Sequence, residues 1–178
     1  MTYFDELRAA MARLAQEKDT LFVGQGVRYD NHALYRTLQD EAGNPIVPMS
    51  RRIELPVAEE FQMGYCTGLA IAGYLPIAIY PRWDFLILAA NQLVNHLDKL
   101  PYSTFDAKVI IRVGVGAKYP LDSGKQHTQD HSAAFRLMLE TVEVIELNSK
   151  FDIAEGYEYA LGSPDSCILV ERQDLYNA

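Results

Sequence analysis

Residues 55–80, LPVAEEFQMGYCTGLAIAGYLPIAIY, combine a helical segment and a buried strand in one short stretch. Pro56 suits the first position of a helix, and small and apolar residues continue to Ala72, where Gly73 is a typical stop. The segment LPIAIY then forms an unbroken apolar run that ends at Pro81. Because an unbroken run is typical of a strand buried on both faces, it predicts a parallel sheet covered by helices.

The same alternation of helix and strand patterns extends along the whole chain. Apolar residues at three- and four-residue steps predict a helix over 3–17, and KVIIRVGV (108–115) is the clearest strand. Together these patterns predict one α/β domain over residues 1–178, doubly wound, with a mostly parallel sheet and helices on both faces. The expected helices are 3–17, 56–72, 83–98, 132–139 and 151–161, and the expected strands are 20–24, 52–55, 75–80, 108–115, 142–147 and 166–171.

Composition narrows the classes of function. The chain has 178 residues and a formal net charge of −8, which argues against nucleic acid or an anionic membrane as the main partner. It contains no apolar run of about 20 residues that could span a membrane, and its start carries acids and does not read as a signal peptide. Cys66 and Cys167 lie in apolar stretches, so we expect buried reduced thiols in a cytoplasmic protein.

Two acids, Glu59 and Glu60, stand near the carboxyl end of an expected strand, at the head of a segment that is otherwise small and apolar. In a sheet of this kind, ligands bind beyond the carboxyl ends of the strands. Acids are also common in the first turn of a helix, where the backbone dipole favours the anion, so position alone does not establish a site. The strand ends fall at 24–28, 56–60, 81–85 and 114–131.

A pair of histidines, His127 and His131, lies in the polar loop that follows the clearest strand, with Asp130 between them. A four-residue spacing can bring two zinc ligands together on a helix, but this segment reads as a loop and no third ligand is evident. The simpler interpretation of His127 is a histidine on a surface loop. The pair leaves an unrelated α/β hydrolase or metal enzyme as one alternative.

Four stretches, in chain order, resemble the pyrimidine-binding domain of thiamine-diphosphate-dependent enzymes. The similarity is nearest to the β subunits of 2-oxoacid dehydrogenase E1 components, with transketolases further away, and covers roughly residues 3–172. It depends on Pro-x-x-Glu followed by Gly-x-x-x-Gly-x-Ala-x-x-Gly, joined to a later Gln-His-Thr-Gln. The stretches are FVGQGV (22–27), LPVAEEFQMGYCTGLAIAGYLPIAIYPRWDF (55–85), NQLVNHLDKL (91–100) and KVIIRVGVG…QHTQDHSAAF (108–135).

The resemblance implies a catalytic role for Glu59. The spacing to Gly64 and Gly68 matches the family's glutamate to this position, and Glu60 is the alternative if the register shifts by one. In the family, a carboxylic acid hydrogen-bonded to N1′ of the cofactor pyrimidine helps the neighbouring 4′-amino group to remove the proton on C2. Such an acid must be desolvated to keep its proton near neutral pH.

Further site residues follow from the same resemblance. Phe85 matches an aromatic that stacks on the aminopyrimidine, and Trp83 would line the pocket beside it, although either could be an ordinary core aromatic. His127 matches an active-site histidine that faces the substrate and can relay protons or stabilise charge on a carbonyl oxygen. Gln129 and Arg82 are expected to line the substrate pocket.

The chain also departs from the family pattern. Gln25 stands where related β subunits often carry an acid, and its neutral amide can hydrogen-bond the cofactor but cannot relay a proton. The sequence has neither the Gly-Asp-Gly motif of the family's diphosphate-binding domain nor its C-terminal third domain. The resemblance therefore implies an α-like partner subunit that holds Mg²⁺ and the diphosphate. Thiamine diphosphate would be shared across the interface of an α₂β₂ heterotetramer, with no metal site on this chain.

The reaction class stays open at this point. The expected substrate is a small 2-oxoacid, and the Gln-His-Thr-Gln context favours E1-like decarboxylation with acyl or aldehyde transfer. Gln25 and the missing third domain favour a smaller decarboxylase or a transketolase-type carboligase that transfers a two-carbon or acyl unit. A non-catalytic, regulatory homologue that keeps the fold is a further alternative.

Overall fold

A single six-stranded sheet organises the computed structural model, which describes residues 1–118 and 122–176. Every neighbouring pair of strands is parallel, in the order β2-β1-β3-β4-β6-β5, so the predicted α/β class is confirmed and the sheet is wholly parallel. The strands are β1 (Thr20–Gly24), β2 (Arg52–Glu54), β3 (Leu75–Tyr80), β4 (Ile110–Val115), β5 (Glu143–Leu147) and β6 (Cys167–Arg172).

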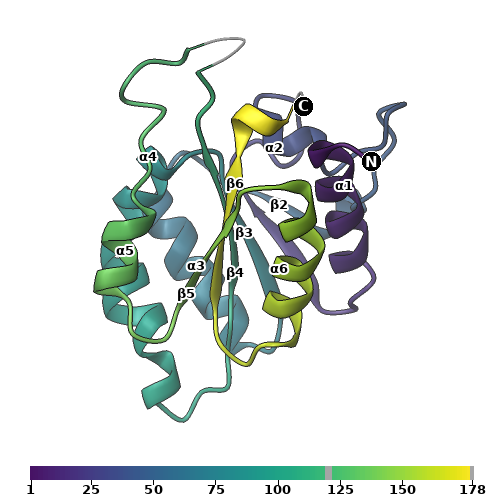
Figure 1. Cartoon of the computed structure of the whole chain (residues 1–178). Coiled ribbons are helices and arrows are strands. Elements are labelled where there is room, and N and C mark those ends of the chain that lie inside the picture. The colour runs from purple at the N-terminus through teal and green to yellow at the C-terminus, as the bar shows by residue number, and fades with distance from the viewer. Residues whose placement is uncertain (119–121, 177–178) are drawn as a thin grey trace.

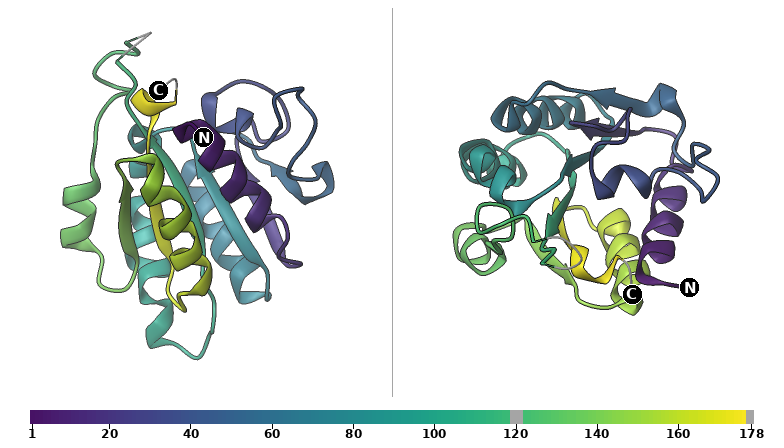
Figure 2. Two further views of the ribbon diagram at one scale, coloured as in Figure 1. Left: turned by 45° about the vertical axis from the view of Figure 1, so that its right-hand side comes forward. Right: turned by 90° about the horizontal axis from the view of Figure 1, so that it is seen from above.

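Helices cover both faces of this sheet, as the view from above in Figure 2 makes plain. One face carries α1 (Tyr3–Leu14) and α6 (Lys150–Gly162), with the short α2 (Ala33–Arg36) beside them. The other face carries α3 (Glu59–Ile71), α4 (Trp83–Leu86) and α5 (Ser132–Met138), as Figure 1 shows. The remaining helical turns are η1 (Met49–Arg51), η2 (Ile87–Ala89), η3 (Gln92–His96), η4 (Leu97–Tyr102) and η5 (Gln173–Leu175).

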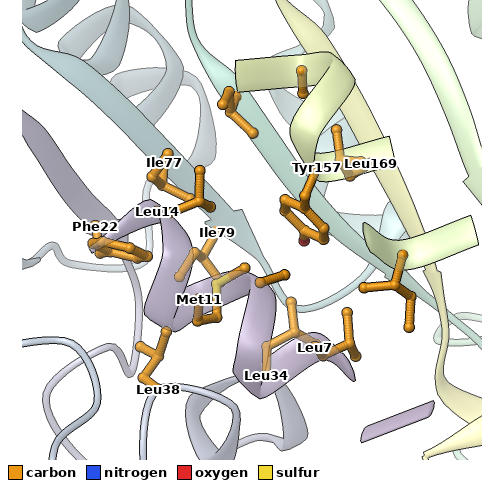
Figure 3. Packing of buried hydrophobic residues seen from close by; sticks show 14 of the residues in the cluster. Leu7, Met11, Leu14, Phe22, Leu34, Leu38, Ile77, Ile79, Tyr157 and Leu169 are labelled. Carbon is orange, nitrogen blue, oxygen red and sulfur yellow. The ribbon is translucent and has the colours of Figure 1, made fainter. Parts of the chain in front are cut away.

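The core has two layers because the strands bury both of their faces. On α1, Leu7, Met11 and Leu14 recur at three- and four-residue steps and are all buried. They pack with Phe22 of β1 and Ile77 of β3, as Figure 3 shows. A second cluster lies on the opposite side of the sheet, beneath α3 and α5. The unbroken apolar runs in the sequence are thus explained by burial on both sides.

The start of α3 differs from the prediction. The helix begins at Glu59 and not at Pro56, because the N–H of Leu55 donates to the carbonyl of Gly24 at 3.0 Å and extends the pairing of β2 with β1. The backbone stays non-helical through Ala58. As a consequence, Glu59 is the first helical residue after the carboxyl end of β2.

The segment expected as one helix over 83–98 is irregular. After α4 it passes through a 3₁₀ turn (η2), a π-helical turn (η3) and a second 3₁₀ turn (η4) that contains Pro101. The polar region 25–52, where no helix was expected, contains α2. Its first turn is capped by a ring nitrogen of His32, which accepts from the N–H of Tyr35 at 3.2 Å.

Two expectations about the chain as a whole can be compared with the described residues. Cys66 and Cys167 are both buried and free, as predicted for reduced thiols. Within residues 1–118 and 122–176, no helix is long and apolar enough to cross a membrane.

Candidate functional site

The carboxyl ends of β1 and β3 meet at one edge of the sheet, the edge from which the loop between β4 and α5 extends in Figure 1. Gly24 of β1 is paired with Ile79 of β3. A Cβ atom at Gly24 would lie 2.6 Å from the carbonyl oxygen of Ile79, so a side chain at this position would push the two strand ends apart. Glycine therefore lets the two strands close tightly beneath the site.

Glu59 is buried at this edge, with 7% of its surface exposed. The side-chain amide of Gln25 donates to its Oε1 atom at 3.2 Å. Among the residues that the structure describes, none donates to Oε2. The carboxyl group is therefore held at one oxygen only, which makes Glu59 a candidate ligand-binding residue.

The backbone around Glu59 is fixed by two side chains that sequence reasoning missed. The buried hydroxyl of Tyr80, the last residue of β3, donates to the carbonyl of Glu59 at 3.1 Å. Gln62, one helical turn further on, donates to the carbonyl of Ile79 at 2.9 Å. Burial of the Tyr80 hydroxyl holds its pKa well above the usual value, so it stays a neutral donor. Both contacts attach the start of α3 to β3.

Glu60 lies in a different environment from its neighbour. Its side chain is exposed, and its carboxylate accepts from the amide of Asn91 at 3.0 Å. Of the two acids, only Glu59 is buried beside Gln25, so the geometry favours the first of the two registers considered from the sequence.

The loop after β1 carries Gln25 and is shaped by Glu54. The Glu54 carboxylate accepts the backbone N–H groups of Gly26 at 2.6 Å and Val27 at 2.9 Å. His32 reaches back to the same loop, with its Nε2 atom 2.8 Å from the carbonyl oxygen of Gln25. An acid inside the short expected strand 52–55, one residue before its end, was the sequence signal that could have identified Glu54.

Phe85 and His127 come together at the same edge although they lie far apart in the sequence. Their ring centroids are 5.6 Å apart and the rings are nearly perpendicular, at 86°. Both side chains are half-buried. No hydrogen bond to the His127 imidazole comes from a described residue, so its ring nitrogens are free to meet a ligand.

Trp83 has a different position from the one the sequence suggested. None of its side chain is exposed, its ring packs 4.8 Å from that of Phe135, and its indole N–H donates to Ser132 Oγ at 3.1 Å. Of the two interpretations considered from the sequence, this geometry favours that of a core aromatic, because a fully buried ring offers no surface to a cofactor.

The other two residues expected in the substrate pocket have protein partners. Gln129 is exposed, and its side-chain amide donates to Asp84 Oδ1 at 2.7 Å. Arg82 directs its guanidinium at the loop that carries His127 and donates to the carbonyl of His127 at 2.7 Å. Both residues therefore adjoin the predicted site while being held by other parts of the chain.

The alternative of a metal site finds no support in the described part of the chain. No cluster of three or more histidine, cysteine, aspartate or glutamate side chains with the arrangement of a metal site occurs there. His131 packs against Trp83, with the ring centroids 6.4 Å apart. The two histidines of the sequence pair thus contact different aromatic partners.

Known proteins similar to this chain are β subunits of the pyruvate dehydrogenase E1 component. The subunit of Gracilaria tenuistipitata var. liui is 27% identical over 180 residues, which are 98% of this chain and 53% of that protein. The mitochondrial subunit of Saccharomyces cerevisiae is 26% identical over 182 residues, 99% of this chain and 48% of that protein. This chain is a distant homologue of the E1 β subunits.

This chain spans about half the length of the curated relatives it matches. Two solved structures share its fold. A split-gene transketolase described as an inactive β4 tetramer matches with a TM-score of 0.69 and 15% identity, over 97% of this chain and 51% of that one. A transketolase of Campylobacter jejuni subsp. jejuni matches with a TM-score of 0.68 and 13% identity, over 97% and 26%. No protein-family model matches the sequence.

Proposed function

We propose that this chain is the pyrimidine-binding subunit of a thiamine-diphosphate-dependent enzyme that acts on a small 2-oxoacid. It would be active only with an α-like subunit that holds Mg²⁺ and the diphosphate. The observation that carries the proposal is Glu59, a buried acid at the carboxyl edge of a parallel sheet, with Oε1 held by Gln25 and Oε2 free of described donors. Distant homology to E1 β subunits supports the choice of cofactor.

The donor set at this edge fits an aminopyrimidine. A protonated Glu59 can donate from Oε2 to a ring nitrogen, while the Gln25 amide orients the carboxyl group through Oε1. The half-buried ring of Phe85 offers an apolar face for the flat heterocycle. When bound, thiamine diphosphate supplies a nucleophilic carbon for the 2-oxo group and accepts the electrons of the bond that breaks.

His127 is the proposed acid–base group on the substrate side. Its imidazole is half-exposed and, within the described residues, has no hydrogen-bond partner, so it can exchange a proton with the carbonyl oxygen of a 2-oxoacid. Gln129 stays a proposed pocket residue, since its exposed amide lies on the same loop. Arg82 stays in the pocket as a neighbour of His127, through the contact described above.

A surface for the proposed α-like subunit lies on the outer side of α3. Val57 and Phe61 are 80% and 55% exposed there. A Cβ atom added at Gly68 would meet nothing within 4 Å, so this glycine serves no contact inside the chain and leaves room for another backbone. A groove of about 530 Å³ on this side is lined by Glu60, Phe61, Gly64, Tyr65, Gly68, Leu69 and Gln92. We propose that the partner covers this face in an α₂β₂ assembly.

The test combines the chain with a candidate partner, identified by a neighbouring reading frame that encodes Gly-Asp-Gly and a downstream Asn. Consumption of 2-oxoacids is measured with thiamine diphosphate and Mg²⁺. Glu59→Gln should lower kcat by at least about a hundredfold, because general acid catalysis contributes that much. The control is Glu41→Gln, on an exposed residue that does not line the groove beside α3, which should stay within about threefold of wild type.

The outcomes separate the alternatives. If Glu59→Gln keeps nearly full turnover, the assignment of Glu59 fails. Turnover that needs lipoamide supports the E1-like reaction, whereas turnover that needs an aldehyde acceptor supports the carboligase that Gln25 favoured. If a stable complex forms with the partner but no 2-oxoacid is consumed and His127 tolerates replacement, the regulatory alternative holds. The regulatory alternative is included because one of the structures with the same fold, the split-gene transketolase β4 tetramer, is described as inactive.

A further inference from the structure

Arg82, at the turn between β3 and α4, is attached to the loop that carries His127. Its Nη1 donates to the carbonyl oxygen of His127 at 2.7 Å and also to that of Gly116. Its Nη2 donates to Ser123 Oγ at 3.1 Å. All three acceptors come from the segment between β4 and α5, and all are neutral. One guanidinium thus holds three separate points of that segment.

The two residues after Arg82 hold the same segment further along. The indole N–H of Trp83 donates to Ser132 Oγ at 3.1 Å, and Asp84 Oδ1 accepts from the amide of Gln129 at 2.7 Å. Three consecutive side chains therefore bind five positions, which are Gly116, Ser123, His127, Gln129 and Ser132. We call Arg82, Trp83 and Asp84 the clasp.

The clasp ends directly before Phe85, whose ring meets the His127 imidazole at 5.6 Å and 86°. His127 has no side-chain hydrogen bond from any described residue, so its orientation depends on its backbone and on this ring contact. The backbone N–H donates to the carbonyl of Gly124 at 2.9 Å, and the carbonyl accepts from Arg82. Of the backbone contacts on His127, only the one from Arg82 connects it to the element that carries Phe85.

We propose that Arg82 is a positioning residue, which holds the backbone of His127 so that its imidazole faces Phe85. This inference rests on the proposed function for its catalytic consequence, but its structural part concerns the chain alone. Burial lowers the pKa of Arg82, yet the group remains a cation and therefore a strong donor to the backbone carbonyls. If Arg82 acts by positioning His127, its replacement should lower kcat. If it bound a substrate carboxylate directly, its replacement would raise KM.

The structural test uses nuclear magnetic resonance on the full chain, which has four histidines. The spectrum of Phe85→Leu first shows how far the ring current of Phe85 shifts the resonances of the His127 ring protons. Arg82→Gln should then move the His127 signal toward the value of an exposed histidine, as Phe85→Leu does. Arg36→Gln, which changes an exposed arginine on α2, should leave the signal in place.

The kinetic test uses the assembled enzyme. Arg82→Gln should lower kcat by about tenfold or more with KM within about threefold, because misplacement of a catalytic group acts on the transition state. The inference is overturned if the His127 signal does not move in folded Arg82→Gln, or if KM rises about tenfold with kcat unchanged. If Arg82→Gln does not fold, Arg82→Lys provides the test. Its His127 resonance should lie between those of wild type and Phe85→Leu, because lysine donates from one nitrogen only. An assembled complex without turnover would contradict the proposed function, while the resonance of His127 would still decide the role of Arg82.

Discussion

Glu59 and Glu171 are both buried acids toward the carboxyl edge of the same sheet, but their partners differ. Glu171, on β6, is fully enclosed and pairs with Arg112 of β4 at 2.6 Å. It also accepts the hydroxyl groups of Tyr157, at 2.7 Å, and Tyr176. Glu59 has one side-chain donor, Gln25, and no described cation bonded to it. The hydrogen-bonding capacity of Glu171 is filled within the chain, whereas that of Glu59 is not.

We propose that this difference distinguishes a structural charge, Glu171, from a functional one, Glu59. Burial alone would lower the pKa of Arg112, but the ion pair with Glu171 holds it above the usual value, so the guanidinium stays charged inside the protein. The hydrogen bonds that Glu171 accepts from Arg112, Tyr157 and Tyr176 leave this carboxylate no capacity for a ligand. Glu59 keeps a carboxyl oxygen without a described donor, which is why we propose it as the ligand-binding acid.

The largest effect on stability is expected at Glu171. Glu171→Ala should lower the free energy of unfolding by about 3–5 kcal/mol, because it leaves the guanidinium of Arg112 buried without its partner. Urea denaturation followed by circular dichroism measures this loss. Glu59→Ala, treated in the same way, should lose no more than about 1 kcal/mol. If Glu171→Ala lost less unfolding free energy than Glu59→Ala, the structural role assigned to Glu171 would be contradicted.

A third buried acid, Asp98, sharpens the comparison because backbone groups satisfy it. It accepts the N–H groups of Glu140, Thr141 and Val142 at 2.8–3.1 Å, and Lys99 lies 3.0 Å away. Burial alone would raise the pKa of Asp98, but these donors hold it below its usual value. Asp98→Asn should therefore cost about 1–3 kcal/mol at pH 7.

The pH dependence of that cost follows from the sign of the shift. A carboxyl whose folded pKa is lowered stabilises the protein above its unfolded pKa, and the contribution is lost as the pH falls through the folded pKa. Unfolding free energies of wild type and Asp98→Asn should therefore converge below about pH 4. A difference that stays constant from pH 7 to pH 3 would contradict this account of Asp98.

A smaller effect than at Glu171 is expected at Gln25. Gln25→Glu brings a second carboxyl to the position 3.2 Å from Glu59 Oε1, where two negative charges repel. We expect a loss of about 1–2 kcal/mol at pH 8 that shrinks as the pH falls, because a shared proton relieves the repulsion. Gln16→Glu adds the same charge to an exposed residue and is the control. Equal pH profiles for the two variants would show that position 25 does not face the Glu59 carboxyl.

Much of the fold could be predicted because burial on both faces leaves a direct trace in the sequence. The limits of β3 were predicted to the residue, and β4 begins at Ile110 where position 108 was expected. The buried ion pair also had a signal that was missed, since Arg112 interrupts an otherwise apolar strand. The irregular turns η2 and η3 had none, because no glycine or proline lies between Phe85 and Leu100.

The candidate site was predictable only in part. The spacing to Gly64 and Gly68 located Glu59, and the structure then distinguished it from Glu60 by burial. The contact of His127 with Phe85 depends on how a long loop folds back onto the clasp, which local sequence patterns do not describe. Trp83 was assigned to the pocket because its neighbour Phe85 matched the family, whereas its own side chain points into the core.

The most direct test of the central claim is a structure of the assembled complex with thiamine diphosphate bound. The account predicts that a carboxyl oxygen of Glu59 lies about 2.6–3.0 Å from a nitrogen of the cofactor's pyrimidine ring, with Gln25 still bonded to the other oxygen. A complex in which the Glu59 side chain faces bulk water, or has only protein partners while the cofactor lies elsewhere, would contradict it.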